Sequence, residues 1–175
     1  MTTENIMRKI KMEKVVLSIG GIAEALEKGN KLLERLTGKK PKKVKSNKRI
    51  PSLNVRPGLE VGTFVTLRNK EAVDMLKRLL AAEENKLKKK QISENSFSFG
   101  VKEYIEIPGF PYQRDIGIIG LDVTVAFARA GKKVAKKKAK RGRLPRKQHI
   151  SKEEIIKFME ENFNTNITEG KHDSK

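Results

Sequence analysis

The sequence predicts an α+β fold, with a mainly antiparallel sheet, helices packed on one face of it, a basic extension and a C-terminal helix. Segments in which apolar residues alternate are interspersed with segments in which they recur every three or four positions. Such helices must cover at least one face of the sheet, which leaves the other face open to a partner. With 175 residues, 37% of them hydrophobic, the chain is sufficient for one domain.

The first elements follow from periodicity and from turn residues. A strand is predicted over residues 13–19, where apolar residues alternate and two glycines follow. Helical spacing of apolar residues over 22–36 predicts an amphipathic helix, and Gly38 is a typical C-terminal stop. A second strand is expected over 59–68, after the Arg-Pro-Gly turn at 56–58.

A second helix is expected to begin at Asn69 as its N-cap and to bury an apolar stripe within residues 72–80. Alternation predicts further strands over 97–105 and 122–128, separated by a loop rich in glycine and proline. The last helix is predicted by a capping box formed by Ser151 and Glu154.

The domain prediction is a single domain over residues 1–167, followed by a disordered tail over 168–175, with fraying expected from about Thr165. No apolar stretch approaches the length of a membrane span, and the N-terminus lacks the apolar region of a signal peptide. We therefore expect a cytoplasmic protein without a membrane partner.

Positive charge is concentrated in three runs, at residues 39–49, 86–90 and 129–149. They hold 22 of the 40 lysines and arginines and no acidic residue, so the net charge of +19 comes from local patches. Clustered cations release many counterions when they bind phosphates, which favours a nucleic-acid partner. Two runs lie between expected ordered elements, which argues against a localisation signal or a merely solvated face.

Catalysis is the rival interpretation, and the sequence supports it poorly. Cysteine is absent, and the two histidines, His149 and His172, have no metal-binding spacing. Gly20-Gly21 lacks a phosphate-loop pattern and is better explained as a structural turn. Four acidic residues that could be paired carboxylates are equally typical of charged rims and turns: Glu103, Glu106, Asp115 and Asp122. We expect no enzyme activity, no cofactor and no metal.

Several stretches together resemble the universal L-five family of large-subunit ribosomal proteins. They are MEKVVLSIG, LLERLTGKKP and VTLR in the first part, and NSFSFGVKEYIEIP followed by IGIIGLDVTV in the second. The lysine-rich segment and the helix SKEEIIKFMEENF resemble the archaeal and eukaryotic branch of the family. The resemblance covers roughly residues 6–167.

This resemblance implies a ribosomal protein that binds 5S rRNA and neighbouring large-subunit rRNA in the central protuberance. It also implies contacts with the peptidyl-site tRNA, with neighbouring proteins of the central protuberance and with the small-subunit head. The family fold is an antiparallel sheet with helices on one face, and its open face meets 5S rRNA. Nucleolar transit is expected if the protein is eukaryotic.

Carried over by residue, Lys14 and Thr66 match family positions on the RNA-facing sheet. Three positions depart from the pattern of relatives: Ser18 stands where bacterial relatives usually have asparagine, Lys39 replaces the usual glutamine, and Leu53 stands where phenylalanine is common. The loop at 83–96 corresponds to the one that reaches toward tRNA, and its candidates are Lys86, Lys88, Lys89 and Lys90. The other candidates for rRNA contact are Lys43, Lys45, Asn47, Lys48, Arg49, Arg56, Arg68, Arg129, Lys132, Lys133, Lys136, Lys137, Lys138, Arg141, Arg143 and Arg146.

Three hypotheses remain open from the sequence. The first is a structural ribosomal protein that binds 5S rRNA. The second is a free-standing RNA chaperone or tRNA-binding factor on the same fold, and the third is an enzyme that acts on nucleic acid. The segment over 129–147 is expected to be an rRNA clamp that becomes ordered on binding.

Overall fold

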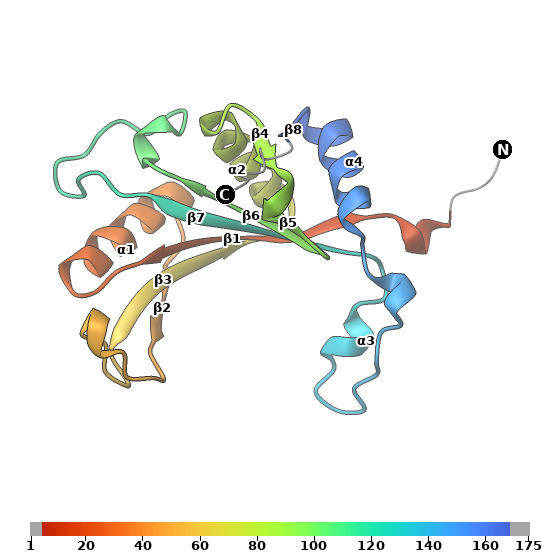
Figure 1. The fold of residues 1–175 in the computed structure, drawn as a ribbon, viewed down its shortest axis with the longest axis horizontal. Helices are drawn as coiled ribbons and strands as arrows, with labels where there is room; N and C mark the ends of the chain where they lie inside the picture. The colour runs from red at the N-terminus through yellow and green to blue at the C-terminus, as the bar shows by residue number, and fades with distance from the viewer. Residues whose placement is uncertain (1–4, 169–175) are drawn as a thin grey trace, which may run out of the picture. The chain divides into compact units, whose positions relative to one another are not determined.

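The computed structural model describes residues 5–168, and Figure 1 shows the arrangement of its elements. The α-helices are α1 (Glu24–Thr37), α2 (Asn69–Ala82), α3 (Lys133–Lys136) and α4 (Lys152–Phe163). The strands are β1 (Lys11–Gly20), β2 (Lys42–Lys45), β3 (Glu60–Leu67), β4 (Lys86–Lys88), β5 (Ile92–Ser93), β6 (Ser96–Val101), β7 (Leu121–Ala128) and β8 (Asn166–Thr168). Short 3-10 helices are η1 (Ile6–Arg8), η2 (Pro51–Leu53), η3 (Lys89–Gln91), η4 (Tyr104–Glu106) and η5 (Arg146–Gln148).

The predicted α+β class with a mainly antiparallel sheet is confirmed. The large sheet has six strands in the order β2-β3-β1-β7-β6-β5, and a small parallel sheet pairs β4 with β8. The described chain groups into two compact units, residues 16–67 with 100–123 and residues 5–15 with 68–99 and 124–168. The single domain expected over 1–167 stays a prediction.

In the unit of residues 16–67 and 100–123, helix α1 packs on β3 and β1, as Figure 1 shows. Its apolar stripe is buried, and the absence of a side chain at Gly29 admits Ile19, because a Cβ there would lie 2.9 Å from the Ile19 Cγ2. Asn30 accepts a hydrogen bond of 3.0 Å from the buried Thr63. The predicted stop at Gly38 is confirmed, with a left-handed φ of 65°.

In the other unit, α2 and α4 bury apolar stripes of their own. The capping box of α4 is confirmed, because the Ser151 hydroxyl accepts from the Glu154 N–H and the Glu154 carboxylate accepts from the Ser151 N–H. The N-cap of α2 is Arg68, one residue earlier than predicted, and Asn69 is the first helical residue.

Three differences from the predicted elements have physical causes. Residues 42–45 form a strand despite their charge, because they complete the edge of the sheet against β3. Strand β6 ends at Val101 instead of residue 105, since Tyr104 turns inward, is 1% exposed and donates its backbone N–H to the Ile119 carbonyl. The fraying expected from Thr165 is wrong up to residue 168, because Thr165 is buried and β8 pairs with β4. Residues 169–175, where the rest of the tail was expected, lie outside the described part, as does His172.

Candidate nucleic-acid interface

Strand β1 separates a buried face from a polar, partly exposed one. Val15, Leu17 and Ile19 are 0%, 0% and 4% exposed, and the intervening Lys14 and Ser18 are partly exposed. In β3, Val65 and Leu67 are buried and Thr66 between them is partly exposed. The alternation of side chains in a strand therefore places these three predicted residues on strand faces that point away from the core.

Strand β2 extends this partly exposed face beyond what the sequence indicated. Lys42 lies opposite Phe64 and Val44 opposite Gly62 in the antiparallel register. Directly opposed residues project to the same side of a sheet, so Lys42 and Val44 join the exposed face of β3. Lys42 was not among the predicted contacts, because charge alone does not reveal which residues of a run form a strand.

Lys43, by contrast, lies opposite Thr63, whose side chain reaches α1. Its ammonium forms a 2.8 Å ion pair with Glu60. The hydrogen bond to Glu60, then the charge of Glu60, raises the pKa of Lys43. Lys43, a predicted rRNA contact, is therefore already paired with an acidic residue of the same protein.

The loop between β2 and β3 is closed by its own backbone. Ile50 and Val55 pair across it, the Gly58 N–H donates to the Ser46 carbonyl, and Val55 is 5% exposed. Leu53 is 60% exposed at the tip. The predicted polar contacts of this loop and its flanks are all exposed: Lys39, Lys45, Asn47, Lys48, Arg49, Arg56 and Arg68.

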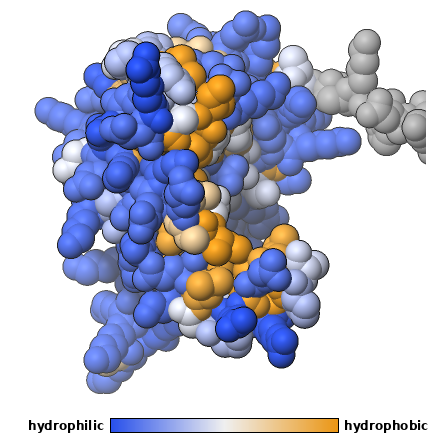
Figure 2. Space-filling model, turned by 90° about the vertical axis from the view of Figure 1, so that its left-hand side faces the viewer, coloured by the Kyte–Doolittle hydropathy of each residue, from blue (hydrophilic) through white to orange (hydrophobic). Residues whose placement is uncertain are grey.

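The same unit carries other exposed apolar side chains, including Tyr112 (55% exposed) and Ile118 (65% exposed) in the loop before β7. Figure 2 shows a strip of apolar side chains among hydrophilic ones on the side that it draws. Exposed apolar side chains therefore lie between the charged ones on this surface.

The basic segment, which we define as residues 129–149, has structure of its own. Arg141 donates its Nε–H to the Ala135 carbonyl at 2.6 Å, and the Gly142 N–H donates to the Val134 carbonyl. Helix α3 lies within it. These contacts give the segment internal structure. Its ordering on RNA binding stays a prediction.

Glu13 of β1 anchors the basic segment. It forms a 2.7 Å ion pair with Lys132 and a second ion pair with Lys136. Burial raises the pKa of the Glu13 carboxyl, but hydrogen bonds and charges from the two lysines outweigh it and lower the pKa to about 2. The other predicted cations of the segment are exposed: Lys133, Lys137, Lys138, Arg141, Arg143 and Arg146.

This anchor predicts a local response to acid. Because the pKa of Glu13 is lowered from 4.5 to about 2, its ion pairs stabilise the fold fully above pH 4.5 and lose that contribution as the pH falls toward 2. We expect the amide resonances of Val134 and Gly142 to shift in that interval, and Glu13→Gln to remove the shift. Glu24→Gln, in an exposed pair on α1, is the control and leaves the shift in place. An unchanged titration in Glu13→Gln would contradict the anchor.

The lysines of the 86–90 run flank one buried residue. Leu87 is 1% exposed, and it lies opposite Ile167 where β4 pairs with β8. Lys86 forms an ion pair with Glu84, and the Lys88 N–H donates to the Gln91 side chain at 2.8 Å. Lys86, Lys88, Lys89 and Lys90 are exposed. The backbone of this run is therefore fixed while its cationic side chains reach solvent.

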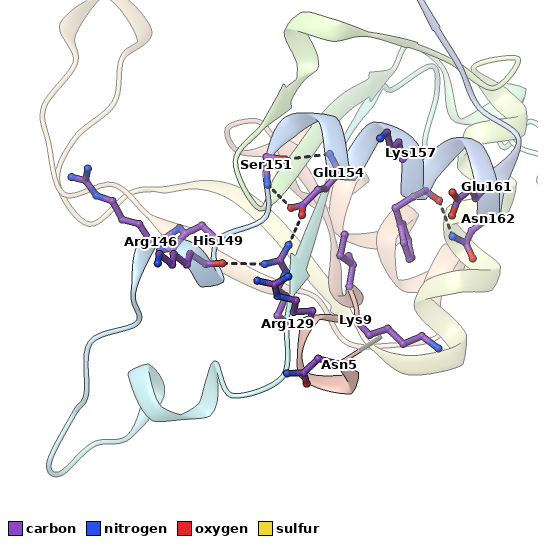
Figure 3. Close-up of a pocket in the computed structure, with 14 residues that line it drawn as sticks. Asn5, Lys9, Arg129, Arg146, His149, Ser151, Glu154, Lys157, Glu161 and Asn162 are labelled. Carbon is purple, nitrogen blue, oxygen red and sulfur yellow. Dashed lines mark hydrogen bonds and ion pairs between the residues drawn. The ribbon is translucent and has the colours of Figure 1, made fainter. Parts of the chain in front are cut away.

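A hollow of about 1210 Å³ lies between the N-terminal segment (residues 5–10), the basic segment and α4 (Figure 3). Arg129 spans its wall, donating to the Lys147 carbonyl at 3.1 Å and to the Glu154 carboxylate at 2.6 Å. Arg129 and Arg146 are predicted contact residues, whereas the lining residues Arg8, Lys9 and Phe158 were not predicted from the sequence.

The residues considered for catalysis are not brought together as a metal site. Among residues 5–168, no group of three or more histidine, cysteine or acidic side chains is placed to hold a metal ion. The Nδ1 of His149 lies 3.1 Å from the Nδ2 of Asn95. The Gly21 N–H donates to the Val61 carbonyl, which agrees with a structural turn. Glu106, Asp115 and Asp122 are exposed. No helix of the described part is long and apolar enough to cross a membrane.

The fold and its surface define a basic α+β protein with cations on a partly exposed strand face, in a loop and in an anchored segment. Residues 60–165 match the model of the C-terminus of the ribosomal L-five family. The chain is 42% identical to "Large ribosomal subunit protein uL5" of Nanoarchaeum equitans, over 94% of this chain and 99% of the relative. It is 41% identical to the protein of that name from Sulfolobus acidocaldarius, over 95% and 96%. The chain belongs to the ribosomal L-five family, as the resemblance in its sequence indicated, and these relatives are archaeal.

Proposed function

We propose that this protein is a structural component of the large ribosomal subunit that binds 5S rRNA and neighbouring large-subunit rRNA. The observation that carries the proposal is the similarity, over 94–95% of the chain, to proteins named large ribosomal subunit protein uL5. The role is one of binding and positioning, without catalysis. As a ribosomal component the protein would work in the cytoplasm.

The mechanism is electrostatic anchoring combined with recognition of shape. A-form RNA is contacted mainly through phosphates, 2′-hydroxyls and exposed loops. The partly exposed faces of β1 and β3 offer one ammonium and two hydroxyls, from Lys14, Ser18 and Thr66. Lys42, on the continuation of that face in β2, adds a further phosphate contact.

The lysines of the 86–90 run are assigned a different partner, the tRNA in the peptidyl site. Their support is that Leu87 and the β4–β8 pair fix the backbone while the side chains are exposed. The exposed apolar side chains of the loop before β7 suit contacts with neighbouring proteins of the central protuberance or the small-subunit head.

Equilibrium binding across a salt series tests the proposal. The protein is titrated with 5S rRNA and with an unrelated structured RNA of the same length. We expect a steep loss of affinity with salt, about 0.7–0.9 in log–log slope for each phosphate contact, and a preference for 5S rRNA that persists at high salt. Equal affinity for both RNAs would contradict specific 5S binding. Release from large subunits by a high-salt wash would favour a free-standing factor.

The assigned division of labour is also testable. Lys14→Ala should lower the salt slope for 5S rRNA by about 0.7–0.9, and Thr66→Ala should cost about 1 kcal/mol of binding free energy. Alanine at Lys88, Lys89 and Lys90 together should leave 5S affinity nearly unchanged and weaken binding to the tRNA-loaded subunit. Lys31→Ala, which removes an exposed charge from α1, is the control. Equal loss of 5S affinity in both sets would refute the division.

A further inference from the structure

The hollow beside α4 combines a surplus of positive charge with an aromatic side chain. Six cationic and two acidic residues line it, and its volume is about 1210 Å³. The cations come from separate parts of the chain: Arg8 and Lys9 from the N-terminal segment, Arg146 and Lys147 from the basic segment, and Lys157 from α4. The sixth cation is Arg129.

The Arg129 side chain is held in a fixed position in the wall of the hollow. It is only 10% exposed, and two of its nitrogens are held by the Lys147 carbonyl and the Glu154 carboxylate, as Figure 3 shows. Its Nε is buried and has no hydrogen-bond partner among the described residues. Arg129 is therefore fixed in the wall of the hollow, and the exposed cations are those of the rim.

Phe158 supplies a fixed aromatic surface. It lines the hollow, it is half-buried, and its ring meets the ring of Phe127 edge to face at 5.5 Å and 70°. Phe127 is fully buried. One turn later, Glu161 and Asn162 line the same hollow; the Asn162 amide donates to the Phe158 carbonyl, and the Glu161 carboxylate is exposed.

We infer that this hollow holds one unpaired nucleotide of the bound RNA, with its base against the Phe158 ring and its phosphate among the rim cations Lys9, Arg146 and Lys147. The inference rests on the proposed RNA-binding function and specifies one feature of the RNA. Bases that are splayed out of single-stranded loops and bulges are commonly stacked on aromatic side chains. A free phosphate would contact the cations but not the aromatic ring. An acidic peptide would pair with the cations, but it has no planar base to stack on the ring.

A tryptophan at position 158 provides the direct test. The chain has no tryptophan, so Phe158→Trp introduces a single fluorophore. The variant is titrated with a single-stranded RNA hexanucleotide of mixed sequence and with an abasic strand of the same length. We expect the hexanucleotide to quench the fluorescence and the abasic strand to bind without quenching. Phe163→Trp is the matched control, because Phe163 is half-buried on the same helix and does not line the hollow.

Affinities of unlabelled variants give a second measurement. Phe158→Leu should weaken hexanucleotide binding about 10-fold and leave the abasic strand unaffected, as expected for the loss of one stacked base. Phe163→Leu should change neither. Equal binding of the two strands to the native protein, or no effect of Phe158→Leu, would overturn the inference. If Phe158→Leu fails to fold, the tryptophan titration decides alone.

Charge variants test where the phosphate lies. Arg146→Gln should weaken binding of the abasic strand, and Arg143→Gln, in the same segment but outside the hollow, should not. Equal losses would overturn this placement. A preference for 5S rRNA that survives in Phe158→Leu, together with unquenched tryptophan, would refute the nucleotide site and leave the proposed function intact. Quenching without any preference for 5S rRNA would refute the proposed function and retain the site.

Discussion

Replacing Gly120 by alanine is expected to lower the free energy of unfolding by about 3 kcal/mol, since overpacking against rigid groups typically costs about 1–3 kcal/mol and occasionally more. A Cβ at this position would lie 2.6 Å from the Lys102 carbonyl oxygen and 2.9 Å from that of Val101. Both obstacles are backbone atoms, so no side-chain rotation relieves the clash. Urea denaturation followed by circular dichroism measures the effect.

Gly20→Ala is the matched control for this prediction. Gly20 ends β1, is exposed, and would meet no atom within 4 Å of its added Cβ. We expect its free energy of unfolding to stay within about 0.5 kcal/mol of the native value. Similar stability of the two variants would show that the chain relaxes around residue 120 at little cost.

The second large effect is expected at Asn95, which joins three parts of its unit. Its backbone N–H donates to the Ile150 carbonyl, its carbonyl accepts from the Phe127 N–H, and its Oδ1 accepts from the Ile150 N–H at 2.8 Å. Its φ is 61°, which asparagine tolerates better than most residues. Asn95→Ala leaves the backbone N–H of the fully buried Ile150 without its side-chain acceptor, and it places alanine at an unfavourable φ. We therefore expect the free energy of unfolding to fall by about 3 kcal/mol.

Two further variants separate these contributions. Asn95→Gly relieves the backbone but still loses the side-chain acceptor, and should be about 1 kcal/mol less damaging than Asn95→Ala. Asn54→Ala, at an exposed position with a φ of 52°, tests the backbone contribution alone. If all three variants were equally stable, the hydrogen bond to Ile150 would contribute nothing to the fold. Amide exchange at Ile150 provides a local measurement of the same bond.

Local patterns predicted much of the fold. The alternation of Val15, Leu17 and Ile19, the helical spacing before Gly38 and the capping box at Ser151 all correspond to the observed elements. These signals act over a few residues, so neighbouring positions are enough to reveal them. The partial exposure of Lys14, Ser18 and Thr66 agrees with the strand phase that the sequence indicated.

Features that depend on distant partners could not be predicted. In the sequence Glu13 is an ordinary strand acid, and only the folded chain places Lys132 and Lys136 beside it. Lys42 becomes part of a strand because β3 pairs with it, and Phe158 becomes a lining residue because the basic segment and the N-terminal segment face it. Charge runs indicate that RNA is bound, but not which cations are already paired within the protein.

The pairing of β4 with β8 also constrains the order in which the protein forms during synthesis. Residues 86–88 find their partners at 166–168, so the lysine-bearing strand lacks its neighbour until almost all of the described chain has left the ribosome that makes it. Closure across such a long sequence separation is slow compared with the formation of local helices. The surface assigned to tRNA is therefore completed last, after α2 and the strands of the large sheet have been translated.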